Sequence, residues 1–331
     1  MLLAPSPVMF FGGKGGVGKT TLATATALAL AEQGHEVTLV STDPAHNLGH
    51  LFGTTLGDDP TPLTPHLRAI EIDPQAATEA HLAQVGDSLR RFLPERLHGQ
   101  ARKHLDLARQ SPGTAEAALV ERIATLVSEH DAGQSAAGGS YLIFDTAPSG
   151  HTARLMALPE IMAAYTDGLL ARRDKADKFA DLVQGMSTSG RSSGAATAAG
   201  PVERRNQEIR STLYARRTRF ERLRAVLSSA QTTFHIVLTA ERLPVLESTE
   251  FYQELTSHGI RVGSLLINRR TPAEAGEFLA ARRAAEDSAL ELLRSRLEEL
   301  PPTSVVEIPW LPYEASSLEA LRELSARVCA G

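Results

Sequence analysis

Cysteine is nearly absent from this chain of 331 residues, which contains only Cys329. A single cysteine excludes an intrachain disulfide and any metal site built from several thiolates of one chain. Long apolar runs are missing as well, since no stretch approaches the roughly 18 residues that a membrane-spanning helix needs. The first residues carry no basic charge ahead of their apolar stretch and do not resemble a signal peptide. We therefore expect a cytoplasmic protein.

The chain also lacks a strong excess of charge of either sign. Its formal net charge is -5, and 22% of its residues are charged. This balance gives no reason to expect the whole surface to attract nucleic acid or anionic lipid. With 42% hydrophobic residues the chain can bury a sizeable core. We expect an ordinary globular protein with no specific nucleic-acid partner.

Short apolar runs alternate with stretches of helical periodicity. The runs are Val8–Phe11, Val37–Val40, Tyr141–Phe144, His235–Leu238, Val262–Ile267 and Val305–Ile308. A helical stretch covers Thr20–Gln33, and Gly34 is expected to end it. Buried strands that alternate with helices predict an α/β fold, with a doubly wound, mostly parallel sheet in a single domain over 1–331. Ligands of such sheets bind at the carboxyl ends of the strands.

Two segments with helical patterns, 74–135 and 160–230, interrupt this alternation. We expect them to form an inserted helical subdomain that serves as a cap or as a client-binding surface. Residues 185–200 are so rich in Gly, Ser and Ala that we expect disorder there. Residues 202–227 combine many arginines with one apolar stripe, which indicates either a solvated face of a packed helix or a helix that lies on anionic lipid.

A glycine-rich motif, GGKGGVGKTT, follows the first apolar run at 12–21. Residues 13–20 fit the phosphate-loop pattern G-x-x-x-x-G-K-[ST], in which glycines let backbone N–H groups approach phosphate oxygens closely. Lys19 supplies a charge for the β- and γ-phosphates, and Thr20 supplies a hydroxyl for Mg²⁺. The predicted nucleotide-binding residues of the loop are Gly13, Gly15, Gly16, Val17, Gly18, Lys19, Thr20 and Thr21. The motif therefore predicts that the chain binds ATP with Mg²⁺.

A dinucleotide-binding loop is the alternative interpretation. The same glycines fit G-x-G-x-x-G, and Asp43 follows the second apolar run, where such a site needs an acid for the ribose. Lys19 and Thr20 argue against this alternative because a pyrophosphate site requires neither. Asp145 ends the third run, where an acid suits a water-mediated contact to Mg²⁺. ATP is the ligand that the pattern favours.

Lys14 is an additional lysine early in the motif. It cannot easily fold back onto the phosphates of its own loop, but it can reach phosphates that a second subunit binds. The alternative is an ordinary solvated lysine on the surface.

The stretch GKGGVGKTT resembles the deviant Walker A motif of ATPases that dimerise around nucleotide. Further stretches narrow the resemblance: STDPAHNLGHLF (41–52), EIDP (71–74), FDTAPSGHTARLMALP (144–159), LTAERLPVLEST (238–249), LLINRR (265–270) and IPWLPYEASSLEAL (308–321). In order along most of the chain, they resemble the family of the arsenite-pump ATPase (ArsA) and of the eukaryotic ATPase that targets tail-anchored membrane proteins. One nucleotide-binding unit is present here, whereas the arsenite-pump ATPase has two in tandem.

The resemblance implies roles for the matching residues. Asp43, in the first switch, would orient the attacking water, and Asp145, in the second switch, would hold Mg²⁺ through water. Lys14 would complete the site of the partner subunit, so that a homodimer closes around ATP, with Lys14, Lys19 and Asp43 as catalytic residues. The implied switch residues are Pro44, His46, Asn47, Pro148, Gly150, His151 and Thr152.

The same resemblance implies how the base is bound. Asn268 would read the edge of the adenine, and the segment that starts with Pro309 and Trp310 would lie beside it.

Two departures from the family pattern bear on the client. The metalloid site of the arsenite pump uses several thiolates, as a soft As(III) centre demands, and the targeting factors carry a Cys-x-x-Cys pair; this chain has only Cys329. We favour an ATPase that captures and delivers a membrane-protein client, which fits a cytoplasmic location with peripheral membrane contact. The alternatives are the ATPase subunit of an arsenite or anion efflux pump, and a partition or positioning ATPase on DNA or membrane.

Overall fold

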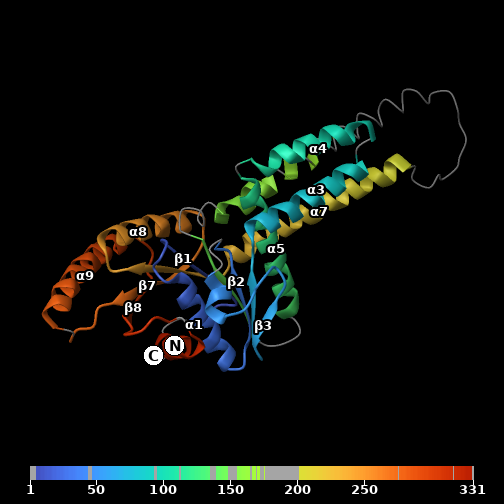
Figure 1. Ribbon diagram of the computed structural model, residues 1–331. Coiled ribbons are helices and arrows are strands. Elements are labelled where there is room, and N and C mark those ends of the chain that lie inside the picture. Colours follow the sequence, from blue (N-terminus) through green and yellow to red (C-terminus); the bar gives the residue numbers. More distant parts are fainter. Residues whose placement is uncertain are drawn as a thin grey trace, which may run out of the picture.

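The computed structural model describes residues 5–43, 47–92, 95–111, 113–134, 139–147, 155–164, 166–168, 170–171, 175, 201–274, 276–315 and 317–329. An eight-stranded sheet with the order β3-β4-β2-β5-β1-β6-β7-β8 forms its centre (Figure 1). The strands are β1 Val8–Gly13, β2 Glu36–Ser41, β3 Thr61–Thr64, β4 Leu67–Glu71, β5 Ser140–Asp145, β6 Thr232–Thr239, β7 Val262–Arg270 and β8 Ser304–Pro309. Only the β3–β4 pair is antiparallel. The predicted α/β fold with a mostly parallel sheet is confirmed.

Helices cover both faces of this sheet. They are α1 Lys19–Glu32, α2 Asn47–Phe52, α3 Pro74–Phe92, α4 Glu95–Arg109, α5 Thr114–Gln134, α7 Pro201–Leu227, α8 Arg242–Ser257, α9 Gly276–Leu297 and α10 Leu318–Cys329. One apolar core lies between the sheet and α1 with α10, and the other lies between the sheet and α5, α7, α8 and α9. Side chains of β1 alternate between the two cores, as expected for a central strand.

Aromatic residues of neighbouring strands stack in the second of these cores. The Phe10 ring lies 4.6 Å from that of Phe144 and 5.8 Å from that of Phe234, and all three side chains are fully buried. Because these residues come from β1, β5 and β6, the stack fixes the centre of the sheet. The carboxyl ends of these strands, where the motifs lie, are thereby held in register.

Helix α1 is rich in alanine, and its small side chains are buried where the helix packs on the sheet. It begins after Gly18 and covers the predicted Thr20–Gln33 within one residue at each end. Gly34 adopts a left-handed conformation with φ 87°, and its N–H donates to the Ala31 carbonyl at 3.0 Å. This glycine therefore ends the helix as expected.

Strands β3 and β4 were not predicted. β3 has four residues and contains Pro62, which an edge strand tolerates because one side of it forms no ladder. In β4 the exposed Arg68 interrupts the buried residues, so the segment lacks a continuous apolar run. Neither strand therefore contains the kind of apolar run that predicts the other six.

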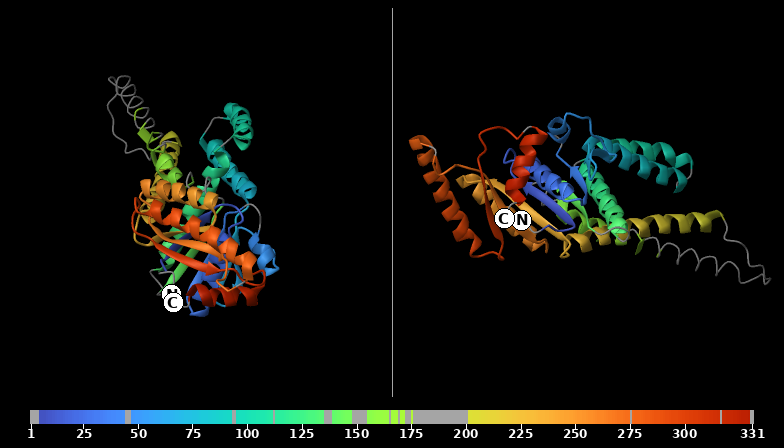
Figure 2. Two further views of the ribbon diagram at one scale, coloured as in Figure 1. Left: turned by 90° about the vertical axis from the view of Figure 1, so that its left-hand side faces the viewer. Right: turned by 90° about the horizontal axis from the view of Figure 1, so that it is seen from below.

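Helices α3, α4 and α7 project beyond the sheet as an arm (Figures 1 and 2). At the base of the arm, Glu121 of α5 joins the other helices: its Oε2 lies 2.6 Å from His81 Nδ1 of α3 and 3.2 Å from Arg216 Nη2 of α7. Helix α4 has no buried residue. The segment 185–200, expected to be disordered, lies outside the described residues. Among those described, we find no helix with the length and apolarity to cross a bilayer.

Candidate nucleotide-binding site

The phosphate loop connects β1 to α1, as its motif predicts. A Cβ atom added to Gly13 would lie 2.1 Å from the Val237 carbonyl oxygen of β6, so only glycine fits there. Gly18, directly before α1, has φ 98°, which also favours glycine. Loop and helix together therefore direct backbone N–H groups and a helix N-terminus toward one point, where an anion would bind.

Lys19 is buried at the start of α1, with an exposed fraction of 5%. Its Nζ donates to the Lys14 carbonyl oxygen at 3.1 Å, which closes the loop. Burial lowers the pKa of Lys19, while the nearby Asp145 and Asp43 oppose this shift. The ammonium group thus lies between the loop and two carboxylates. A phosphate bound in the loop would place its negative charge close to this ammonium group.

Asp145 ends β5 at the same edge of the sheet. Its Oδ2 accepts hydrogen bonds from Thr20 Oγ1 at 2.6 Å and from Ser41 Oγ at 3.5 Å. Burial raises the pKa of Asp145 to about 7, although these hydrogen bonds and Lys19 favour the charged form. Its buried Oδ1 has no hydrogen-bond partner within the described part of the chain. An unpartnered carboxylate oxygen beside a hydroxyl suits Mg²⁺, which takes oxygen ligands and keeps several waters.

The predicted first switch segment begins beside this carboxylate. The Thr42 N–H donates to the Asp145 carbonyl oxygen at 2.9 Å, and the Asp43 N–H donates to Ser41 Oγ at 3.3 Å. The ends of β2 and β5 are therefore tied together, and the structure places Asp43 near both Lys19 and Asp145. The predicted switch residues Pro44, His46, Pro148, Gly150, His151 and Thr152 lie outside the described residues.

Glu71 binds the first turn of α2, the helix after the predicted first switch. This role was not predicted from the sequence. It is buried at the end of β4, and its Oε1 accepts the Leu48 N–H at 3.2 Å in the first turn of α2, which begins at Asn47. A carboxylate at a helix N-terminus stabilises the unpaired N–H groups there. The signal lay in the quoted stretch EIDP, whose first residue is this glutamate.

A cavity of about 1070 Å³ opens beside the phosphate loop. Gly18 and Thr21 line it from the loop, Asn268 from β7, and Pro309 and Trp310 from the end of β8. The predicted base-binding residues are thus brought together with the loop, although about 250 residues separate them in sequence. We missed Arg282 of α9, which also lines the cavity.

The conformation of β7 aims Asn268 at the phosphate loop. Arg269 has φ 57°, and the pairing of β7 with β8 shifts register between Ile267 and Arg270. Asn268 Nδ2 donates to the Val17 carbonyl oxygen at 2.8 Å. One of the two N–H groups of Nδ2 is used in this way, which leaves the amide oxygen and the second N–H for a ligand.

Lys14 forms an ion pair with a side chain of α8. Its Nζ lies 2.8 Å from Glu247 Oε1 of α8, and the two side chains are 40% and 35% exposed. The contact of Lys14 with phosphates of a second subunit stays a prediction. Glu247 lies 233 residues further along the chain, and nothing in the local sequence pairs it with Lys14.

These features define the class of the protein: an α/β P-loop nucleotide-binding protein with one carboxylate at the end of β5, the neighbour of β1, and a second just after β2, the next strand in the sheet. The chain belongs to the anion-transporting ATPase (ArsA) family, whose model matches residues 6–330. Membership in this family implies ATPase activity.

Named relatives of the chain divide between two kinds of ATPase. It is 30% identical to "Putative arsenical pump-driving ATPase 2" of Aquifex aeolicus, over 96% of this chain and 97% of that protein. It is 31% identical to an arsenical pump-driving ATPase of Acidiphilium multivorum, where 95% of this chain matches 48% of the relative. It is 30% identical to the ATPase GET3 of Malassezia globosa, over 96% and 89% of the two chains. The chain thus spans about half the length of the second relative.

Proposed function

We propose that the protein is a Mg²⁺-dependent ATPase that works as a homodimeric switch and couples the ATP cycle to capture and delivery of a membrane-protein client. The convergence of Lys19, Thr20, Asp43 and Asp145 at the carboxyl ends of β1, β2 and β5 supports the ATPase part. Phosphoryl transfer depends mainly on positioning and on neutralisation of charge, which two carboxylates and a buried lysine around a phosphate loop can supply.

Each residue has a defined task in hydrolysis. The loop and Lys19 bind the β- and γ-phosphates, while Asp43 orients a water molecule for attack on the γ-phosphorus. The new bond forms to the water oxygen as the bond to the ADP oxygen breaks, and ADP and phosphate leave. Thr20 and, through water, Asp145 would hold Mg²⁺, which offsets negative charge on the phosphates when bound.

Asn268 favours adenine over guanine. One N–H of its Nδ2 is held by the Val17 carbonyl oxygen, which fixes the orientation of the amide and leaves Oδ1 and the second N–H for the base. The exocyclic amino group of adenine donates to such an oxygen, whereas the O6 carbonyl of guanine at the equivalent position would repel it. ATP therefore fits this cavity better than GTP.

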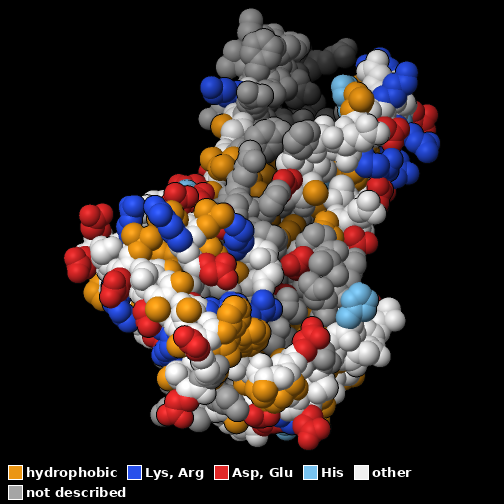
Figure 3. All heavy atoms as spheres, turned by 60° about the vertical axis from the view of Figure 1, so that its left-hand side comes forward, with side chains coloured by type: hydrophobic (Ala, Val, Ile, Leu, Met, Phe, Trp, Pro, Cys, Tyr) orange, Lys and Arg blue, Asp and Glu red, His pale blue; other side chains and the backbone are white. Residues whose placement is uncertain are grey.

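Lys14 and exposed apolar side chains support a homodimer. Lys14 is paired with Glu247 and can be released to the phosphates of a second copy. Leu243, Phe278 and Trp310 are exposed by 56%, 83% and 45%. Figure 3, in which the side that carries α8 and α9 comes forward, shows apolar side chains interspersed with basic and acidic ones on this face. Such a mixed surface suits a protein partner.

The arm is the proposed contact site for the client. In α4, Leu107 is 69% exposed and no residue is fully buried. The names of relatives favour a second candidate, the ATPase subunit of an anion pump, since two of those described above are named arsenical pump-driving ATPases. The single cysteine speaks against a multi-thiolate metalloid trigger.

Steady-state ATPase assays of the purified chain distinguish these functions. A tail-anchored peptide is added in one arm and antimonite or arsenite in the other, with Lys19→Ala as the control that lacks turnover. We expect Mg²⁺-dependent hydrolysis that the peptide changes and the metalloids do not. Stimulation by the metalloids alone would favour the pump, and the absence of any hydrolysis would refute the ATPase itself.

A further inference from the structure

Trp310 forms part of the base cavity but lies on a segment without regular structure. Residues 310–315 follow β8 and precede α10, and the Trp310 side chain is 45% exposed. Its backbone N–H donates to the Arg270 carbonyl oxygen at 2.8 Å. This bond fixes the chain at the start of the segment, but it does not fix the orientation of the indole ring.

A side chain of α9 supplies the missing support. The guanidinium carbon of Arg282 lies 5.2 Å from the centroid of the Trp310 ring, in the geometry of a cation–π contact. Both residues line the base cavity. The planar guanidinium group can stack on an aromatic face, which the point charge of a lysine does less well.

Arg282 is itself held by a buried carboxylate. Its Nε lies 3.1 Å from Glu286 Oε1, one turn further along α9. Glu286 is 4% exposed and also accepts hydrogen bonds from the N–H and hydroxyl of Thr271 and from Arg270 Nη1. Burial would raise the pKa of Glu286, but these hydrogen bonds outweigh it and the pKa is lowered. The carboxylate therefore stays charged and maintains its ion pair with Arg282.

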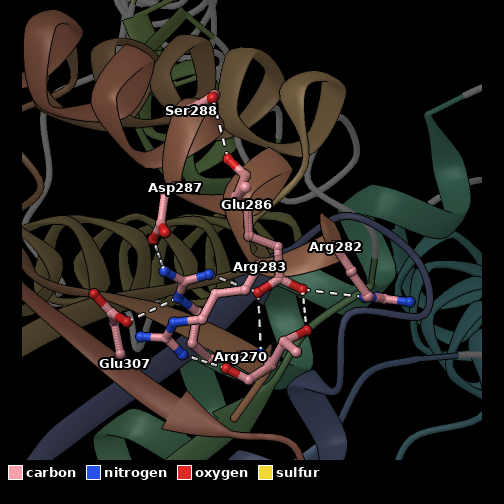
Figure 4. A network of polar contacts seen from close by, with 9 residues as sticks. Arg270, Arg282, Arg283, Glu286, Asp287, Ser288 and Glu307 are labelled. Atoms are coloured by element: carbon pink, nitrogen blue, oxygen red, sulfur yellow. Dashed lines mark hydrogen bonds and ion pairs between the residues drawn. The ribbon is translucent and has the colours of Figure 1, made fainter. Parts of the chain in front are cut away.

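Arg270 connects this network back to the tryptophan (Figure 4). Besides Glu286, its guanidinium binds Glu307 of β8 at 2.9 Å and also Asp287. The same residue accepts the Trp310 N–H and lies two positions after Asn268. The end of β7, strand β8 and the middle of α9 are thus joined by one network of hydrogen bonds and ion pairs beside the base cavity.

We propose that Arg282 is a positioning residue for adenine: it holds the Trp310 indole as a wall of the base cavity. This inference rests on the proposed ATP site and adds to it a residue that specifies the base rather than the phosphates. A base that stacks on an aromatic ring gains affinity only when the ring is already in place. Loss of Arg282 should therefore weaken binding through the base alone.

Inorganic tripolyphosphate separates base from phosphate recognition because it carries the phosphates of ATP without a base. Binding of ATP and of tripolyphosphate is measured by calorimetry for the full chain and for Arg282→Gln, Arg282→Lys and Arg294→Gln, the last an exposed arginine of the same helix. Trp310 is the only tryptophan, so iodide quenching of intrinsic fluorescence reports on its ring directly.

We expect Arg282→Gln to weaken ATP binding about two- to fivefold, the factor that an exposed cation–π contact supplies, and to leave tripolyphosphate unaffected. Iodide quenching should rise in the same variant. The ATP affinity of Arg282→Lys should lie between that of Arg282→Gln and that of the unmodified chain. Arg294→Gln should bind ATP as tightly as the unmodified chain.

Unchanged ATP affinity in Arg282→Gln would overturn the inference, as would an equal loss for both ligands, which would indicate general damage to the site. If the unmodified chain bound neither ligand, both the proposed ATP site and the inference about Arg282 would be refuted. If it bound tripolyphosphate and ATP equally, the phosphate site would stand and the role of Arg282 would be refuted.

Discussion

Asp43 and Asp145 lie at the ends of β2 and β5, which are neighbouring strands, but their surroundings differ. Asp145 is fully buried, and its pKa is raised to about 7. Asp43 is partly exposed just after the end of β2, and its charge acts on both Lys19 and Asp145. The buried carboxylate suits a fixed ligand of a cation, and the exposed one suits contact with water.

The first prediction concerns Asp43. Asp43→Asn keeps the size of the side chain and removes the charge that orients water, so ATP binding should persist while turnover falls by about a hundredfold or more. Calorimetry of ATP binding and a phosphate-release assay measure the two effects. Normal hydrolysis would exclude Asp43 as the water-orienting residue.

The second prediction concerns the buried His235 of β6, whose Nδ1 lies 2.6 Å from Ser264 Oγ. Burial, with a smaller effect of Arg261, lowers its pKa from 6.5 to about 4. The unfolded chain thus binds more protons between these values, so stability is full above pH 6.5 and decreases as the pH falls toward 4. Between pH 7 and pH 5 this histidine should lower the free energy of unfolding by about 2 kcal/mol.

Urea denaturation at both pH values measures this effect. On acidification, the free energy of unfolding should decrease less in His235→Gln than in the unmodified chain. In His258→Gln, a change at an exposed histidine, it should decrease as much as in the unmodified chain. The comparison with a variant is needed because Asp145, with a raised pKa, acts in the opposite direction over the same range. An identical acid dependence for all three proteins would contradict the prediction.

The sequence predicted those residues of the site that lie in local motifs. Lys19 and Thr20 follow from a loop pattern whose spacing is fixed by the geometry of phosphate binding. The contacts of Glu247 and Arg282 could not be predicted, because they depend on how α8 and α9 pack beside β1 and β8. The orientation of Asn268 likewise depends on the positive φ of Arg269, which its sequence neighbours do not indicate.

At the scale of elements, α5 connects the arm to the site. The helix carries Glu121, which joins α3 and α7, and the next strand along the chain is β5, which ends in Asp145. Burial would raise the pKa of Glu121, but His81, Arg216 and Arg219 lower it, so the carboxylate stays charged at the base of the arm.

The third prediction tests this joint. Glu121→Gln removes the charge that two arginines and a histidine face, and should destabilise the protein by about 1–3 kcal/mol. Hydrogen exchange should increase in α3 and α7 more than in β1. Glu129→Gln, an exposed change on the same helix, is the control. Equal exchange in both variants would show that Glu121 does not hold the arm.

The sequence indicated six of the eight strands because each of the six contains a short run rich in apolar and β-branched residues. It missed β3 because this edge strand has Leu63 as its one large apolar side chain besides Pro62, and it missed β4 because Arg68 separates Leu67 from Ala69 and Ile70. The order of the strands in the sheet could not be predicted from the sequence either. Strand β1 lies between β5 and β6, whereas the next strand in sequence, β2, is not its neighbour.

At the scale of the whole molecule, the fourth prediction concerns dimer closure. Lys14→Ala should fold normally but fail to dimerise with ATP, because Lys14 is proposed to complete the partner's site. Glu247→Gln removes the competing carboxylate and should lower the ATP concentration for dimerisation about two- to fivefold, as expected for a partly exposed ion pair. Sedimentation velocity at several ATP concentrations measures both effects. An unchanged ATP-dependent shift in Lys14→Ala would refute the shared site.

The central place of β1 has a consequence for how the chain acquires its fold during synthesis. Val8 pairs with Leu142 on one side and with Thr232 on the other, so both partners emerge from the ribosome long after β1 itself. Until then an apolar strand has two open edges, which makes the nascent chain slow to fold and prone to aggregate. Asn268 emerges later still, so the phosphate loop is among the first segments made and its contact with Asn268 forms among the last.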